Sequence, residues 1–230
     1  MLGCCGRRGL LVLIVWAWLF AGLLATTVLI ACVRGVPLVI EHLIDMLGRE
    51  PYLASYAEVV AVGGLPLAIS LVCRDDFRVY GLARKGLERS LAVSVPPALA
   101  VLVVRTMLEG VSPRSFNLQF PYNAWYATLG VLAYGPLEVF FVVWLTVNTD
   151  YALNSLKRTL SPGLLITALA FGLSHIAISP QGGLVNAVKV TVIFFILGLI
   201  FKYTKNSVGP MVAWTLINGQ VQHLLLGCLT

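Results

Sequence analysis

The stretch that decides the fold is Leu10–Cys32, LLVLIVWAWLFAGLLATTVLIAC, which contains no charged residue. A helix crosses the roughly 30 Å hydrocarbon core of a bilayer in about 20 apolar residues, so this stretch predicts a transmembrane helix. It follows Arg7 and Arg8 as a secretory signal would, but it exceeds the roughly 7–15 apolar residues of a signal core. We therefore expect a membrane anchor that is retained in the mature protein.

Six further apolar segments follow along the chain, at 57–73, 91–108, 124–147, 162–178, 184–201 and 208–226. The composition agrees, because 59% of the residues are hydrophobic and 11% are charged, whereas a soluble domain has roughly 25% charged residues. The apolar runs do not alternate with period two, so helices rather than a closed barrel satisfy the backbone in lipid. The sequence predicts an all-α, polytopic bundle of about seven transmembrane helices, forming a single integral membrane domain over residues 1–230.

A more polar stretch, 33–56, separates the first two apolar segments. Its charged residues Glu41, Asp45 and Arg49 are interleaved with apolar residues such as Leu43. This pattern is typical of a helix that lies in the membrane interface with one apolar face. We expect a short interfacial helix here.

The net charge of +6 is explained by topology rather than by nucleic-acid binding. If the N-terminus is cytoplasmic and seven helices alternate, eleven of the 16 Lys and Arg residues fall on the cytoplasmic side, which is the orientation that positive charges favour. These eleven are Arg7, Arg8, Arg74, Arg78, Arg84, Lys85, Arg89, Lys157, Arg158, Lys202 and Lys205. We therefore expect a multi-pass protein of the cell membrane that contacts membrane lipids, and no nucleic-acid partner.

Glu138 is the clearest polar exception inside an apolar segment. No other charged residue occurs between Arg114 and Asp150, and an ionisable group within a membrane helix is usually functional or paired. Gly135 and Pro136 precede it and predict a weakened or kinked helix with room for water or substrate. The alternative is a neutral carboxyl that hydrogen-bonds to another helix.

Two later segments carry further polar groups. His175 follows Phe171 by four residues, so the two share one helix face. In the last segment, Trp214, Asn218 and Gln222 form a polar stripe at four-residue steps. The alternative reading of both features is hydrogen bonding between helices.

The three segments, in this order, resemble the CAAX-protease and bacteriocin-processing family of intramembrane proteases, also called the CPBP or Abi family. The family's first motif, Glu-Glu-x-x-x-Arg, is often preceded by Gly-Pro, and here Glu138 follows Gly135-Pro136. Its second motif, Phe-x-x-x-His, is matched by Phe171 and His175.

The third motif of that family is His-x-x-x-Asn, with a proline four residues before the histidine. Pro210 supplies the proline, Asn218 takes the place of the asparagine, and Trp214 stands where the family has histidine. The resemblance covers roughly residues 135–222, within a motif-bearing core at 124–226.

This resemblance implies a protease whose catalytic residues are Glu138, His175 and Asn218. Glutamate and histidine would activate a water to attack a peptide carbonyl, and the asparagine would help to stabilise the oxyanion. The implied substrate is a peptide or protein, including a prenylated tail. We expect the pocket to be completed by Phe171, Trp214, Phe141 and Gln222.

The chain departs from the family pattern at three places: the second glutamate, the arginine (replaced near Val142 or Val143) and the third-motif histidine (Trp214). These departures leave a second hypothesis, a catalytically impaired relative that acts as a membrane scaffold or immunity-type binding protein. A transporter that relays protons or ions through Glu138 and Lys189 ranks last, because intramembrane charges are scarce. No cofactor is expected. Zinc chemistry generally needs three protein ligands, although a metal ion at Glu138 and His175 stays open.

Overall fold

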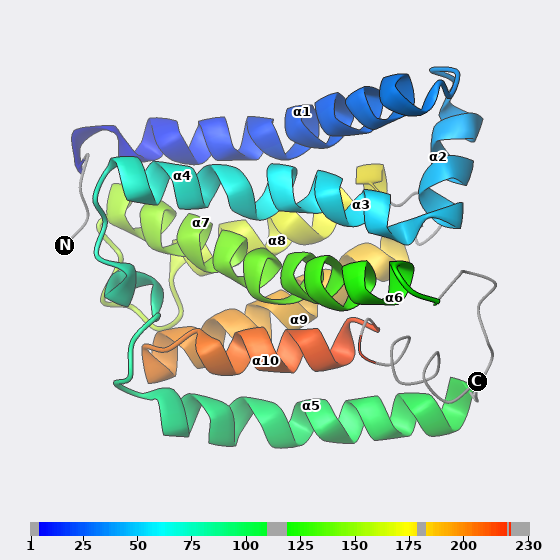
Figure 1. Ribbon diagram of the computed structural model, residues 1–230. Coiled ribbons are helices and arrows are strands. Elements are labelled where there is room, and N and C mark those ends of the chain that lie inside the picture. The colour runs from blue at the N-terminus through cyan, green and yellow to red at the C-terminus, as the bar shows by residue number, and fades with distance from the viewer. Residues whose placement is uncertain (1–4, 110–118, 179–182, 220, 222–230) are drawn as a thin grey trace.

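The computed structural model describes residues 5–109, 119–178, 183–219 and 221, and every regular element in these ranges is a helix (Figure 1). In chain order the elements are η1 (Cys5–Arg7), α1 (Arg8–Arg34), α2 (Ile40–Arg49), α3 (Pro51–Glu58), η2 (Val59–Gly64), α4 (Leu65–Val72), η3 (Phe77–Tyr80), α5 (Leu87–Glu109), α6 (Tyr122–Trp125), η4 (Tyr126–Gly130), η5 (Ala133–Leu137), α7 (Glu138–Ala152), α8 (Pro162–Ile178), α9 (Gly183–Thr204) and α10 (Val208–Ile217). The predicted all-helical polytopic bundle is confirmed.

Within the described ranges, five helical stretches are long and apolar enough to cross a membrane, and two shorter apolar helices pack among them. The five are Arg8–Arg34, Leu53–Val72, Leu87–Leu108, Tyr122–Ala152 and Gly183–Thr204. The shorter helices, α8 and α10, correspond to the fifth and seventh predicted segments. Helix α10 is shorter than expected because the chain leaves helical geometry at Gly219, whose φ of +94° favours glycine.

The short helix expected between the first two spans forms as α2, which lies across one end of the bundle (Figure 1). Its Met46 is buried beside Ala31 and Leu53. Its polar face carries an exposed ion pair between Arg49 and Asp45, with a 2.8 Å separation between Nη2 and Oδ2. One apolar and one charged face suit the interfacial position that the sequence predicts.

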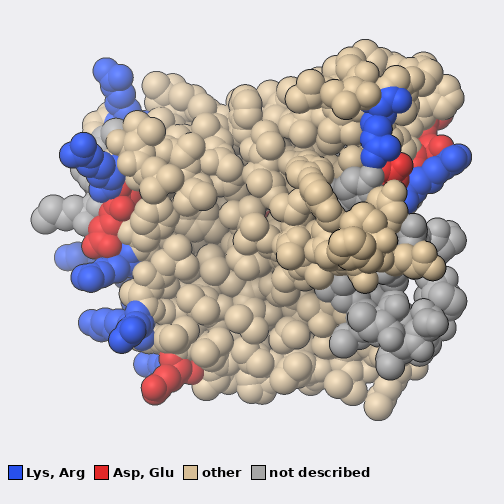
Figure 2. Space-filling model, viewed as in Figure 1, with Lys and Arg blue, Asp and Glu red and all other residues tan. Residues whose placement is uncertain are grey.

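Charged side chains gather at the two ends of the molecule, and the surface between them is uncharged on the face shown in Figure 2. Large apolar side chains are exposed on the long helices α1 and α5, among them Leu13, Leu24 and Val103. A soluble protein would bury such residues, whereas lipid tails accept them. The arrangement is that of a multi-pass membrane protein.

Helix α7 is the centre of the bundle. Every residue from Glu138 to Asp150 is buried, and the helix contacts α1, α8, α9 and α10. Its Trp144 is fully buried and donates a hydrogen bond from Nε1 to Ser70 Oγ on α4, at 2.9 Å. The polar groups on α7 are therefore buried within the bundle.

Three stretches, η2, η4 and η5, are π-helical, a rare conformation that often occurs at functional sites. The η5 stretch contains Pro136, so the predicted distortion before Glu138 takes the form of a π-helical turn. Close packing of these turns depends on glycine. A Cβ atom on Gly63 would lie 2.6 Å from Leu137 Cδ2, and one on Gly135 would lie 2.1 Å from Thr215 Oγ1.

Candidate active site

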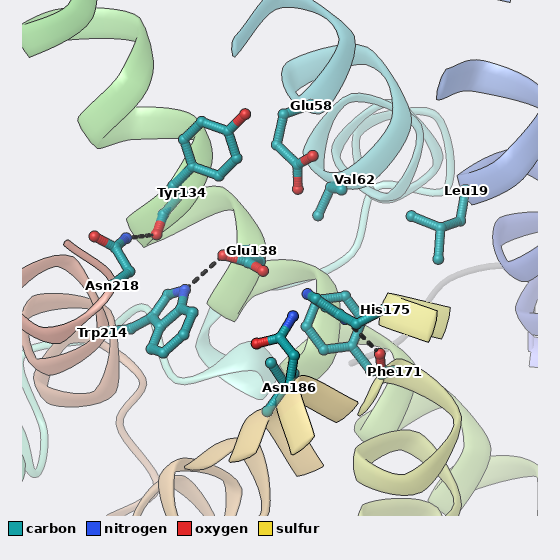
Figure 3. Close-up of a pocket in the computed structure, with 11 residues that line it drawn as sticks. Leu19, Glu58, Val62, Tyr134, Glu138, Phe171, His175, Asn186, Trp214 and Asn218 are labelled. Carbon is teal, nitrogen blue, oxygen red and sulfur yellow. Dashed lines mark hydrogen bonds between the residues drawn. The ribbon is translucent and has the colours of Figure 1, made fainter. Parts of the chain in front are cut away.

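A cavity of about 460 Å³ lies between the helices that carry the three motifs and the N-terminal helices. Its walls come from α1, α3, η2, η5, α7, α8, α9 and α10. The lining residues are Leu19, Glu58, Val62, Tyr134, Glu138, Phe171, His175, Asn186, Val190, Trp214 and Asn218 (Figure 3). Segments more than 150 residues apart in the chain thus share one polar space inside an apolar bundle.

Glu138 is the first residue of α7, directly after the π-helical turn η5, and its side chain is 4% exposed. The indole Nε1 of Trp214 donates a hydrogen bond to Glu138 Oε2 at 2.5 Å. The other carboxyl oxygen accepts no hydrogen bond from the described part of the chain. Because burying a carboxyl without partners is costly, this oxygen is suited to hold a water or a substrate group in the cavity.

His175 lies on α8, with its ring edge-to-face against Phe171 at a centroid distance of 5.0 Å. Its Nδ1 is 2.8 Å from the backbone carbonyl oxygen of Phe171. A carbonyl can only accept, so Nδ1 carries the proton and donates it. The neutral ring then keeps its lone pair on Nε2, which can accept a hydrogen bond from a water or a substrate.

Asn218 follows α10, and its Nδ2 donates a hydrogen bond to the backbone carbonyl of Tyr134 in η5 (Figure 3). One amide N–H is therefore used to join α10 to the π-helical turn. The side chain thereby lies on the cavity wall, at the end of α10.

Trp214 occupies the third-motif position, and its indole supplies a hydrogen-bond donor to the carboxyl of Glu138. Its ring also packs edge-to-face on Phe194, with a centroid distance of 4.8 Å. Indole N–H can donate but cannot accept or carry a proton away. Having tryptophan where the family motif has histidine therefore keeps a hydrogen-bond donor at this point of the cavity and removes a base.

The structure brings five of the seven predicted site residues to one cavity: Glu138, Phe171, His175, Trp214 and Asn218. Phe141 is not on the wall; it is fully buried between Trp16 and Phe171, at centroid distances of 5.7 Å to each. Three positions turn a helix by about 300°, so Phe141 lies near the face of Glu138, and its packing against the two rings keeps it off the cavity wall. Gln222 lies outside the described residues.

Glu58, Tyr134 and Asn186 also line the cavity and were not predicted. Glu58 lies just inside the start of the second apolar segment, and this position of a charged residue was the feature of the sequence that could have indicated a site residue. A charge at the edge of a segment is usually a boundary residue facing headgroups, so the signal is weak. Lys189, which the transporter hypothesis pairs with Glu138, is exposed on α9 and is not on the cavity wall.

Among the residues that the structure describes, no group of three or more His, Cys, Asp and Glu side chains is arranged to hold a metal ion. The cavity offers two carboxyls and one imidazole as donors, on α3, α7 and α8.

No curated protein and no solved structure matches this chain. The family model of the Rce1-like type II CAAX prenyl endopeptidases matches residues 99–219, which is more than half of the 230 residues. The match runs from the middle of α5 to the end of α10 and includes Glu138, His175 and Asn218. The three motifs, the membrane-type bundle and this match agree, and the chain belongs to the Rce1-like family of type II CAAX prenyl endopeptidases.

Proposed function

We propose that this protein is an intramembrane endopeptidase that hydrolyses a peptide bond near the end of a membrane-associated, prenylated protein. The observation that carries the proposal is the convergence of Glu138, His175 and Asn218, from three helical segments, on one cavity inside the bundle. Membership of the CAAX endopeptidase family supports a protein or peptide substrate.

In the proposed reaction a water molecule lies between the unpartnered carboxyl oxygen of Glu138 and Nε2 of His175. Glu138 accepts a proton from this water while the water oxygen forms a bond to the peptide carbonyl carbon. His175 orients the water through its lone pair. General base catalysis of this kind contributes roughly 10²–10⁴-fold to the rate.

The attacked carbonyl oxygen becomes an oxyanion and needs a donor. We assign this role to the side-chain amide of Asn218, which lines the same cavity as Glu138 and His175. A single donor to an oxyanion is worth about 10²–10³-fold in rate. Trp214 keeps the Glu138 carboxyl in place through its indole N–H.

Apolar residues on the cavity wall, Leu19, Val62 and Val190, suit the isoprenoid and aliphatic parts of such a tail. We propose that the protein lies in the cell membrane with its N-terminus in the cytoplasm, because Lys and Arg residues are concentrated on that side of the predicted topology.

The proposal is tested with full-length protein in detergent and a fluorogenic peptide that ends in a CAAX sequence, with and without an S-farnesyl group. Glu138→Gln and His175→Gln should each lower the cleavage rate by about 10²–10⁴-fold. Matched controls are Glu41→Gln and His42→Gln on α2, where both side chains are exposed and remote from the cavity. Preference for the farnesylated peptide tests the prenyl group, and unchanged cleavage in excess EDTA is expected for a reaction without a metal.

Equal background cleavage by the wild type and both cavity variants would contradict the protease. The second candidate is then a scaffold or immunity-type protein that binds a partner without cleaving it. The observation in its favour is Trp214, whose indole stands where a base is expected and already engages Glu138. Binding of the farnesylated peptide without turnover would be its signature.

A further inference from the structure

A second carboxyl faces the same cavity from outside the matched region. Glu58 is the last residue of α3 and precedes the π-helical turn η2, as Glu138 follows the π-helical turn η5. Figure 3 shows its carboxyl group pointing into the cavity, on the side of Glu138. The family match begins at residue 99, so this acid comes from a part of the chain that the family model does not include.

Glu58 has no structural role that the described residues reveal. It is half-buried and forms no hydrogen bond or ion pair within the described ranges. A buried acid with a purely structural role normally has such partners. An unpartnered carboxyl directed into a cavity is instead available to a ligand.

We propose that Glu58 is a second catalytic residue, the general acid that protonates the leaving amine while Glu138 acts on the water. This inference rests on the proposed function and adds a residue to it. Two carboxyls that face one cavity repel each other when both are ionised, so the pair favours one carboxylate and one carboxylic acid. The indole N–H of Trp214 donates to Glu138 and favours the carboxylate there. The proposed step starts with the proton on Glu58 and the negative charge on Glu138.

The proton balance is complete with these two groups. Water adds to the carbonyl carbon, the C=O π electrons move to oxygen, and Glu138 takes a proton from the water. The C–N bond then breaks as Glu58 gives its proton to the amine nitrogen, which leaves a new carboxyl end and a free amine. Transfer of the proton from Glu138 to Glu58 through the cavity restores the starting state.

The groups that titrate and face this pair are few. Among the described residues, the cavity wall holds His175 on α8 and the phenol-bearing Tyr134 on η5, and no Lys or Arg side chain. The Nδ1 atom of His175 is held by the Phe171 carbonyl, so its Nε2 atom is the ring nitrogen that faces the pair. The pH profile of cleavage is therefore expected to report this carboxyl pair as a unit.

The leaving group distinguishes a general acid from a structural residue. An amide needs its nitrogen protonated before it leaves, whereas an ester with a nitrophenol leaving group does not. Glu58→Gln should lower hydrolysis of the farnesylated amide substrate by about 10²–10⁴-fold and change hydrolysis of the matching nitrophenyl ester less than about tenfold, well below the lower end of that range. Glu138→Gln should lower both, because both substrates need the activated water.

The variants share controls for folding. Each is compared with Glu41→Gln for thermal unfolding and gel-filtration profile, and Glu58→Asp retains a carboxylic acid and should restore part of the amide rate. Loss of the alkaline limb of the pH profile in Glu58→Gln, but not in Glu58→Asp, is expected. If Glu58→Gln does not fold, the general-acid role is tested with Glu58→Asp alone. This variant is expected to cleave the ester at the wild-type rate and the amide more slowly.

Three results would overturn the inference. Wild-type amide hydrolysis by Glu58→Gln would show that the acid is not used, while loss in Glu138→Gln would leave the proposed function standing. Equal loss of ester and amide hydrolysis in a folded Glu58→Gln or Glu58→Asp would remove the general-acid role. Background cleavage by the wild type itself would end both the proposed function and this extension of it.

Discussion

The two ends of helix α7 each bury a carboxyl group, and the two groups are treated very differently. Asp150 is fully buried and accepts hydrogen bonds from Ser155 Oγ and Ser161 Oγ at 2.6 Å and from the Gly163 backbone at 2.9 Å, with Lys202 Nζ at 2.6 Å. Glu138 is almost as deeply buried, and the indole of Trp214 is its single donor in the described structure.

The difference in hydrogen-bond partners indicates a structural role for Asp150 and a chemical role for Glu138 on the same helix. Asp150 satisfies its lone pairs with a cation and three donors, and in doing so it caps the start of α8 and joins α7 to α9. Glu138 keeps an oxygen open toward a cavity. A buried charge with a full set of partners stabilises the fold, and one with too few partners beside a cavity is a candidate for catalysis.

A second set of partners strengthens the Asp150 end. Arg8 at the start of α1 bonds to Asp75, and its Nη1 also lies 2.9 Å from Asn148 Oδ1 on α7. Tyr80 donates its hydroxyl to Asp75 Oδ2 at 2.6 Å. The first span, the loop before α5 and the central helix are thus held together by hydrogen bonds at one end, away from the cavity.

The largest effect is expected from Asp150→Asn. Loss of one charge leaves Lys202 buried without its counter-ion, and breaking a buried pair costs about 3–5 kcal/mol. Thermal and denaturant unfolding in detergent should show this loss. Glu138→Gln should unfold within about 1 kcal/mol of the wild type, since it retains an acceptor for the indole. Equal destabilisation by the two variants would contradict the proposed difference between a structural Asp150 and a chemical Glu138.

A smaller effect is expected from Gly135→Ala, which acts on the cavity end. The new methyl group would meet Thr215 Oγ1 and push η5 away from α10, at a cost of about 1–3 kcal/mol. Displacement of Glu138 by about 1 Å would also lower the cleavage rate by roughly 10²-fold. Gly48→Ala is the control, because nothing lies within 4 Å of a Cβ atom there. Wild-type cleavage by Gly135→Ala would show that this contact does not position the carboxyl.

Tyr80→Phe should weaken the hydrogen-bonded end by about 1 kcal/mol, the net value of one hydrogen bond. Burial, followed by the hydrogen bond to Asp75, raises the pKa of Tyr80 to about 12, against about 10 in an unfolded chain. The stability that neutral Tyr80 contributes is therefore present below about pH 10 and is lost as the pH rises toward about 12. Unfolding measured across this range should show the loss in the wild type and not in Tyr80→Phe.

The smallest effect is expected from Arg49→Ala, which removes the exposed ion pair with Asp45. Pairs of this kind contribute about 0–1 kcal/mol because water screens them. Unfolding and cleavage should both stay close to the wild type. A loss as large as that of Asp150→Asn would mean that α2 supports the bundle far more than its contacts indicate.

Hydropathy alone was sufficient to predict the helical membrane bundle, and six of the seven predicted segments lie within about five residues of the observed helices. The motif positions of Glu138 and His175 were also readable, because a charge in an apolar run stands out against its neighbours. The length of α10 was not readable, since Gly219 ends the helix through its backbone conformation and not through polarity.

What the sequence determined is which residues must be in the membrane, because the cost of exposing polar groups to lipid depends on composition along one helix. Which polar groups meet was decided by the tertiary structure, because that depends on how helices rotate and pack. The π-helical turns and the close contacts at Gly63 and Gly135 direct Glu58 and Glu138 into one cavity, and ring packing holds Phe141 outside it. The number of hydrogen-bond and ion-pair partners, which differs between Asp150 and Glu138, likewise depends on how the bundle packs.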